Sequence, residues 1–77
     1  MTLSEKFGHA IVKARKEKGV SQEDLYLKIG RENISRRYLS DVENGKRQVS
    51  IGVLEKVANG LDMKLSELAK IAETIEE

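Results

Sequence analysis

The amino-acid sequence predicts an all-α domain built from five short helices, and three observations support this prediction. Apolar residues recur at helical spacing, and no stretch alternates apolar and polar residues over the length of a strand. The chain has no proline, and its six glycines are isolated, as in helices joined by short turns. Its 77 residues are enough for one small domain.

The expected helices have recognisable ends. A side chain that can accept a hydrogen bond from a free backbone N–H precedes four of them: Thr2, Ser21, Ser35 and Ser50. The fifth helix, from about Leu65, follows Lys64, so we expect it to begin by packing rather than by capping. Gly19 and Gly30 are stop signals for the first two helices. Gly60, inside the fourth apolar stripe, indicates either a close helix contact or an early helix end.

The composition excludes several classes of protein. Hydrophobic residues make up 39% of the chain and charged residues 35%, which is too apolar for a disordered chain and too charged for a membrane protein. The N-terminus lacks the apolar stretch of a signal peptide, so we expect a cytoplasmic protein with no membrane partner. The chain has no cysteine and one histidine, which leaves little for nucleophilic attack or proton transfer. We therefore expect no enzymatic activity, cofactor, metal ion or small-molecule substrate.

Charge is unevenly distributed, although the net charge is only +1. Residues 1–20 carry five basic and two acidic side chains, a balance of +3. Residues 35–48 carry four basic and two acidic side chains, a balance of +2, whereas residues 49–77 have a balance of −3. A basic front and an acidic tail suggest that one side of the protein binds a polyanion.

The second and third expected helices, joined by a turn, fit a helix-turn-helix. Together with Arg15 and the apolar positions between Leu54 and Leu68, the segments Gly19–Leu25 and Ser35–Arg47 resemble the lambda-repressor/Cro (XRE-type) family of DNA-binding domains. Among its subgroups, the chain looks most like the controller proteins of restriction–modification systems or small phage-type repressors. The resemblance implies a compact five-helix domain, residues 1–77, that regulates transcription by binding double-stranded DNA sequence-specifically.

In this family the helix after the turn enters the major groove by its N-terminal end, and an arginine there can donate two hydrogen bonds to guanine. The base contacts implied by the resemblance are Arg36, Arg37, Ser40 and Asp41. The implied phosphate contacts are Gln22, Ser35, Tyr38, Lys46 and Arg47. Most of these contacts have a simpler alternative, since Arg36 and Arg37 could touch only phosphates or solvent, Gln22 could merely help to cap its helix, and Tyr38 could pack beside Leu39. Lys46 and Arg47 could belong to a solvated turn.

Other positions bear on how the third helix is held. Arg15 and Glu43 match a family pair that forms a structural salt bridge between the first and third helices, and a DNA contact for Arg15 is the alternative. The segment between Gly30 and Tyr38 is longer than in the family, with Arg31-Glu32-Asn33 as the surplus. Either the turn is longer or the second helix runs on. Tyr26 stands where the family prefers alanine, and both departures could change the angle of the third helix.

We expect a homodimer, because one recognition helix reads only a few base pairs and a symmetric pair placed about 34 Å apart reads a near-palindromic operator. The last helix, about residues 65–77, carries apolar residues on more than one face. These residues form the expected dimer interface, with Leu65 and Ala72 shared with the core: Leu65, Leu68, Ile71, Ala72 and Ile75. The alternative is a monomer whose fifth helix closes its own core.

RNA polymerase is a further candidate partner of a transcriptional regulator. The alternative function, from another class, is a protein-interaction module, such as an antitoxin or an adaptor with the same fold. Such a module would have a large exposed apolar surface, with neutral residues at the start of the third helix. Arg36 and Arg37 stand there instead, which favours DNA.

Overall fold

A computed structural model describes residues 1–76 of the chain, and Glu77 lies outside the described residues. The described residues form five α-helices and no strand, so the all-α prediction is confirmed. The helices are α1 (Leu3–Glu17), α2 (Gln22–Ile29), α3 (Arg36–Glu43), α4 (Ile51–Gly60) and α5 (Leu65–Thr74). None of these helices has the length and hydropathy of a membrane-spanning segment.

The helix starts follow the sequence signals. The hydroxyl oxygens of all four expected capping residues accept a hydrogen bond from a backbone N–H three positions further on: Thr2, Ser21, Ser35 and Ser50. The side chain of Lys64, which precedes α5, makes no capping hydrogen bond, as expected. Instead, the backbone N–H of Lys64 donates to the carboxylate of Glu67 at 2.8 Å. Local sequence therefore determines where each helix begins.

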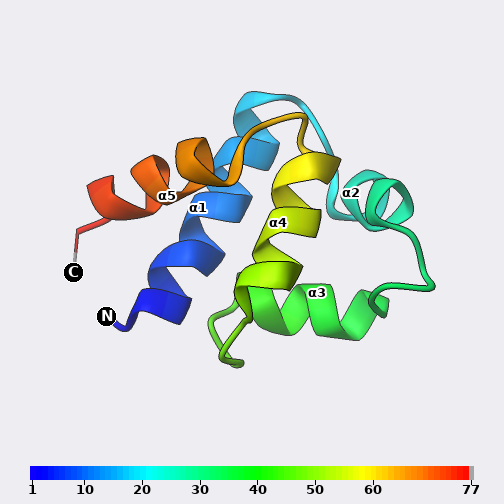
Figure 1. The fold of residues 1–77 in the computed structure, drawn as a ribbon, viewed down its shortest axis with the longest axis horizontal. Coiled ribbons are helices and arrows are strands. Elements are labelled where there is room, and N and C mark those ends of the chain that lie inside the picture. Colours follow the sequence, from blue (N-terminus) through cyan, green and yellow to red (C-terminus); the bar gives the residue numbers. More distant parts are fainter. Residues whose placement is uncertain (77) are drawn as a thin grey trace.

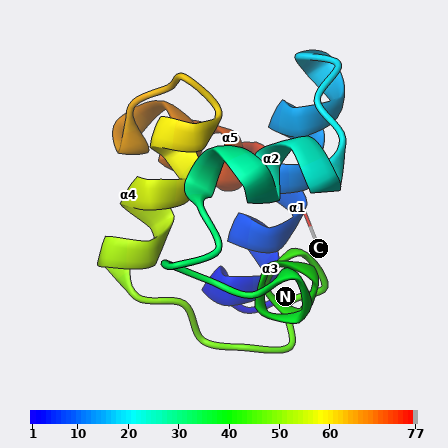
Figure 2. The same ribbon diagram turned by 90° about the vertical axis from the view of Figure 1, so that its right-hand side faces the viewer.

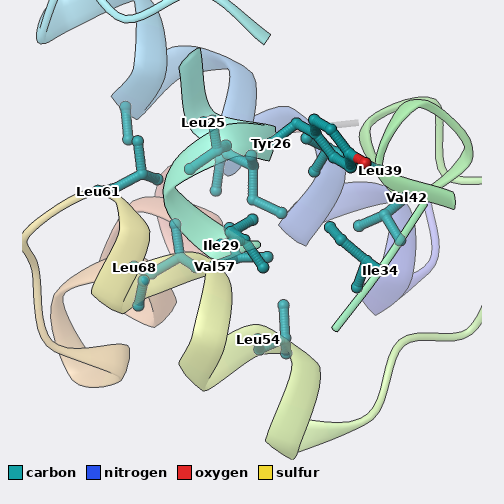
Figure 3. Packing of buried hydrophobic residues seen from close by; sticks show 14 of the residues in the cluster. Leu25, Tyr26, Ile29, Ile34, Leu39, Val42, Leu54, Val57, Leu61 and Leu68 are labelled. Atoms are coloured by element: carbon teal, nitrogen blue, oxygen red, sulfur yellow. The ribbon is translucent and has the colours of Figure 1, made fainter. Parts of the chain in front are cut away.

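The five helices enclose one apolar core. Helix α1 packs against α3 and α5, and α4 packs against α2 and α5 (Figures 1 and 2). Side chains from all five helices are almost fully buried in this core: Ile11, Leu25, Leu39, Val42, Val57, Leu61 and Leu68. Figure 3 shows the apolar side chains of α2, α3 and α4 converging in it. Helices α2 and α3 lie at the end of the molecule opposite the two chain termini (Figure 1).

The connection between α2 and α3 is a long turn rather than an extension of α2. Helix α2 ends at Ile29, and Gly30 has a φ of 96°, a value that favours glycine. Residues 31–33 form the turn itself. Asn33 donates from its side chain to the carbonyl oxygen of Ile29 at 2.7 Å and accepts from Nζ of Lys56 at 3.2 Å, while Ile34 is buried. These contacts hold the inserted residues against the rest of the fold.

Two glycines mark places where helices approach closely. A Cβ atom at Gly60 would lie 3.0 Å from Cδ1 of Leu25 and 3.1 Å from Cγ1 of Ile29. Because Gly60 is also the last residue of α4, both alternatives for this glycine hold together. At Gly8, in α1, a Cβ atom would lie 2.5 Å from the carbonyl oxygen of Val42 and 2.8 Å from that of Glu43. Helix α1 thus lies directly against the backbone at the end of α3.

Gly8→Ala is expected to lower the free energy of unfolding by about 1–3 kcal/mol, because the added methyl group meets backbone atoms of α3 that cannot rotate away. The higher helix propensity of alanine, about 1 kcal/mol, offsets part of this loss. Urea denaturation measures the change. Gly52→Ala is the matched control, since the nearest atom to a Cβ there is Oγ of Ser50 at 3.9 Å. Equal stability of the two variants would contradict the close contact between α1 and α3.

Candidate nucleic-acid interface

Helix α3 has one buried face and one exposed face. Leu39, Val42 and Glu43 point into the fold. With 3.6 residues per turn, Arg37 lies on the opposite side of the helix from these three. The side chains on that outer side, exposed or half-buried, are those of Arg37, Ser40, Asp41 and Asn44. We call these four residues the outer face of α3. An α-helix is about 10–12 Å in diameter with its side chains, so α3 can fit the major groove of B-DNA, which is about 12 Å wide.

Asn44 is the one member of the outer face that the sequence reasoning did not select. Its side chain donates to the carbonyl oxygen of Ser40 at 3.0 Å, and its backbone ends the helix. In the sequence, the dipeptide Asn44-Gly45 is typical of a turn. The signal that could have found Asn44 is its helical spacing from Arg37, since seven residues correspond to about two turns of helix.

The buried carboxylate of Glu43 joins three helices at one end of α3. Arg15, on α1, donates from Nε to Oε2 and from Nη2 to Oε1 of Glu43, both at 3.0 Å. Nη1 of Arg15 also donates to the carbonyl oxygen of Val20 at 3.1 Å. The side chains of Arg15 and Glu43 are 13% and 5% exposed, respectively. Arg15 and Glu43, which match the family's salt-bridge pair, thus lie in contact in the structure. The guanidinium of Arg15 donates its hydrogen bonds within the fold.

Gln22, at the start of α2, takes part in the same network. Its Nε2 donates to Oε1 of Glu43 at 3.0 Å, while Ser21 provides the cap of α2. Ser21, not Gln22, therefore caps α2, and Gln22 links the start of α2 to the last residue of α3. No sequence signal pointed to this link, since the two residues lie in separate helices.

Arg36 lies on the side of α3 that faces α2. It donates from Nε to Oε1 of Glu23 at 2.7 Å and from Nη2 to Oε2 at 2.8 Å. Its guanidinium carbon also lies 4.6 Å from the centre of the Tyr26 ring, within the range of a cation–π interaction. The hydrogen-bonded pair lowers the pKa of Glu23 and raises the pKa of Arg36, so both are charged at neutral pH. The aromatic residue found in place of alanine thus forms a platform for Arg36.

Arg47 repeats this arrangement after α3. Its Nε donates to Oδ2 of Asp41 at 3.3 Å, and its guanidinium carbon lies 5.1 Å from the centre of the Tyr38 ring. The ring of Tyr38 is half-buried and packs against the core. The side chain of Asp41 is 18% exposed, so this carboxylate is partly covered by its own protein.

Within α3 and the segment that follows it, Arg37 and Lys46 are the basic residues whose side chains remain unengaged. Both are exposed, and neither side chain makes a hydrogen bond or ion pair with another residue in the range 1–76. Ser35 accepts the N–H of Tyr38 at 3.0 Å, which leaves its hydroxyl hydrogen free to donate to an anion. The free cation of Arg37 therefore lies near the start of α3, and that of Lys46 follows its end. Ser35, which caps the helix, adds a free hydroxyl donor.

The residues expected at a dimer interface do not form one surface. Leu68 and Ala72 are 0% and 2% exposed and belong to the protomer's own core, so these two side chains offer little surface to a partner. Leu65, Ile71 and Ile75 keep part of their surface. The apolar excess of α5 is narrower than expected because α1 and α4 both pack against this helix.

The most accessible apolar surface near α5 comes from other helices. Leu3, at the start of α1, is 68% exposed, and Ile51, at the start of α4, is 74% exposed. With neighbours from α1, α4 and α5 they line a shallow groove, which we call the apolar groove: Leu3, Phe7, Val49, Ile51, Leu65 and Ala69. Leu65 is the member of the expected interface that lies on this groove.

Known proteins are similar to this chain in both sequence and fold. The sequence model of the helix-turn-helix family matches residues 11–73. Control protein C.MunI of a Mycoplasma species is 47% identical over 64 residues, which cover 82% of each chain. The restriction–modification controller protein C.AhdI of Aeromonas hydrophila has a similar structure, with a TM-score of 0.75, 38% identity, and coverage of 84% of this chain and 94% of that one.

A third relative is known in complex with DNA. The restriction–modification controller protein C.Esp1396I, a tetramer bound to its natural 35-base-pair operator, matches with a TM-score of 0.78 and 33% identity. The match covers 96% of this chain and 99% of that one.

Proposed function

The chain belongs to the helix-turn-helix family, and from this membership we infer that it is a sequence-specific DNA-binding transcriptional regulator that acts as a multimer. The observation that carries this inference is the outer face of α3. It is a short, exposed helix side with an unengaged arginine near its start, and the buried network around Glu43 fixes it to α1 and α2. An α-helix of this kind fits the major groove, where each base pair has a distinct pattern of donors and acceptors.

We propose that the chain is a controller protein of a restriction–modification system, as C.AhdI and C.Esp1396I are. The family is one of DNA-binding regulators rather than enzymes, and we propose no catalytic activity for this member. Because its proposed ligand is DNA, we also propose that it acts in the cytoplasm. RNA polymerase stays a predicted partner.

The proposed contacts divide into two groups. Arg36 and Arg37 would donate to guanine, Ser40 could contact any base, and Asp41 would accept from the exocyclic amine of cytosine. The proposed phosphate contacts are Gln22, Ser35, Tyr38, Lys46 and Arg47. The unengaged side chain of Lys46 and the free hydroxyl hydrogen of Ser35 support this second group. A helix N-terminus with free backbone N–H groups, such as the start of α2 beside Gln22, also favours a phosphate.

Selection of bound duplexes from a random DNA pool tests the proposed function. We expect enrichment of one sequence with two related half-sites about one helical turn apart, and binding that weakens steeply with salt as neutralised phosphates release counterions. Failure to enrich any sequence, with binding that depends only on salt, would contradict it. Recovery of a stoichiometric protein partner without DNA would favour the interaction module instead.

We propose that a second copy of the chain covers the apolar groove. Sedimentation near micromolar concentration is expected to give twice the chain mass of 8.7 kDa. Ile51→Lys is expected to give a monomer, because the charge would be buried in the interface while Ile51 is 74% exposed in the protomer. Leu27→Lys is the control, since Leu27 is 61% exposed but lies on α2, away from the groove. A wild-type chain that stays monomeric at this concentration would remove the proposed interface.

A further inference from the structure

The ion pair between Arg36 and Glu23 occupies the part of the protein that enters DNA first in a helix-turn-helix. Arg36 is the first residue of α3, and the N-terminal residues of a recognition helix contact base edges. In the structure the two donors of its fork, Nε and Nη2, are both hydrogen-bonded to the carboxylate of Glu23. The acceptors O6 and N7 of guanine call for the same kind of two-point donation from an arginine. Glu23 therefore occupies one of the two edges of the guanidinium that could donate two hydrogen bonds to a guanine.

We propose that Glu23 is an internal competitor of DNA: it holds Arg36 against α2 in the free protein and is exchanged for guanine when the protein binds its operator. The inference rests on the proposed DNA-binding function and names a residue that tunes it. Glu23 touches no base in this scheme, so it is a positioning residue that acts through Arg36.

The exposure of the ion pair between Arg36 and Glu23 favours a contact that can open when DNA binds over one that holds the fold together. The side chains of Arg36 and Glu23 are 64% and 51% exposed, so water and salt screen their attraction. Arg15 and Glu43 form the opposite case, because their pair is 13% and 5% exposed and joins helices inside the fold. The protein thus has one buried arginine–carboxylate pair that holds α3 in place and one exposed pair that can open without disturbing the core.

Tyr26 and Glu23 together determine the orientation of the Arg36 guanidinium in the free protein. The guanidinium lies over the Tyr26 ring at 4.6 Å, so the ring limits the directions in which the fork can point. A salt bridge to a nearby carboxylate also keeps the guanidinium away from indiscriminate contacts with phosphates. Opening the pair leaves the charge of Glu23 near the DNA backbone without its partner. Both effects lower the affinity of the wild-type protein for DNA.

Glu23→Gln tests the proposal with the duplex that the wild-type protein selects. We expect this variant to bind the duplex about 3–10-fold more tightly, because the competing carboxylate and its repulsion of phosphates are both removed. Asp24→Asn is the matched control for charge, since Asp24 lies in the same first turn of α2 and does not contact Arg36. In the wild-type background, Glu23→Gln should raise the affinity for the duplex more than Asp24→Asn does. In an Arg36→Ala background, the two substitutions should change the affinity by the same factor.

Two results would overturn the proposal. If Glu23→Gln binds the selected duplex more weakly than the wild type, or no better than Asp24→Asn, then Glu23 supports α3 rather than competing with DNA. In that case the wild-type protein would still select a sequence, so the proposed function would stand. Enrichment of no sequence by the wild type would instead remove both.

A spectroscopic measurement on the wild-type protein gives a second test. The Nε–H proton of Arg36 is hydrogen-bonded to Glu23 in the free protein, so its NMR resonance should shift when the selected duplex is added. An unrelated duplex at the same salt concentration should leave it near its free position. A resonance that stays at its free position when the selected duplex is added would show that Arg36 does not leave Glu23, which contradicts the exchange.

Discussion

Replacing Arg15 by methionine is expected to lower the free energy of unfolding by about 3–5 kcal/mol, because the buried carboxylate of Glu43 loses its ionic partner. The side chain of Glu43 is 5% exposed, so water replaces the two lost hydrogen bonds only poorly. Gln22 continues to donate one hydrogen bond to this carboxylate. At about 0.05–0.15 kcal/mol per residue, a chain of 77 residues has a total stability of about 4–12 kcal/mol, so the variant loses at least about a quarter of it.

Urea denaturation followed by circular dichroism measures this loss of stability. Two further variants serve as comparisons. Arg15→Met combined with Glu43→Leu removes both charges, and we expect it to be much more stable than Arg15→Met alone. Lys28→Met removes the cation of the exposed pair between Lys28 and Asp62, whose side chains are 56% and 78% exposed. We expect that change to leave unfolding nearly unaltered. An Arg15→Met variant as stable as Lys28→Met would contradict a stabilising role for the buried pair.

The parts of the fold that could be predicted from the sequence are those determined by neighbours in the chain. Thr2 and Ser50 cap their helices because a hydroxyl three residues before a free N–H can reach it whatever the rest of the protein does. The surplus residues 31–33 were located by their spacing, and the structure selects the longer turn over a longer α2. The resemblance to a known family supplied the match between Arg15 and Glu43, which no local rule provides.

Contacts between helices were the part that sequence reasoning missed. Glu23 is 13 residues from Arg36, and Gln22 is 21 residues from Glu43, so neither pair lies within the reach of a helical spacing rule. Gly8 gave no sign that it faces the carbonyl oxygens of α3. Each of these contacts depends on the angle between two packed helices, which the pattern of apolar residues restricts but does not determine.

The burial of Leu68 and Ala72 has a related cause. The apolar residues of α5 lie on more than one face, which predicts packing against something beyond the protomer's own core. Helix α5 packs against both α1 and α4, so Leu68 and Ala72 are covered within the protomer. The groove beside Leu65 could not be foreseen, because Leu3 and Ile51 come from helix starts that are distant in sequence.

Arg37→Ala is expected to lower affinity for the selected duplex by about 5–150-fold, because a two-point contact between arginine and guanine contributes about 1–3 kcal/mol of discrimination. Arg37 lies on the outer face of α3, and its side chain makes no hydrogen bond or ion pair with the rest of residues 1–76. Its loss should therefore leave the fold unchanged. Affinity for unrelated DNA should fall much less, so the preference for the selected sequence narrows.

Lys46→Ala provides the comparison that separates base reading from charge. Lys46 is also exposed and unengaged, but it follows the end of α3, where a phosphate contact is proposed. Its replacement should weaken binding to all duplexes by a similar factor and reduce the slope of log affinity against log salt by about 0.9. Arg37→Ala should also change which sequence is selected from the random pool, whereas Lys46→Ala should select the same one. If Arg37→Ala still enriches the wild-type sequence with unchanged preference, the base contact belongs to another residue of the outer face or to Arg36.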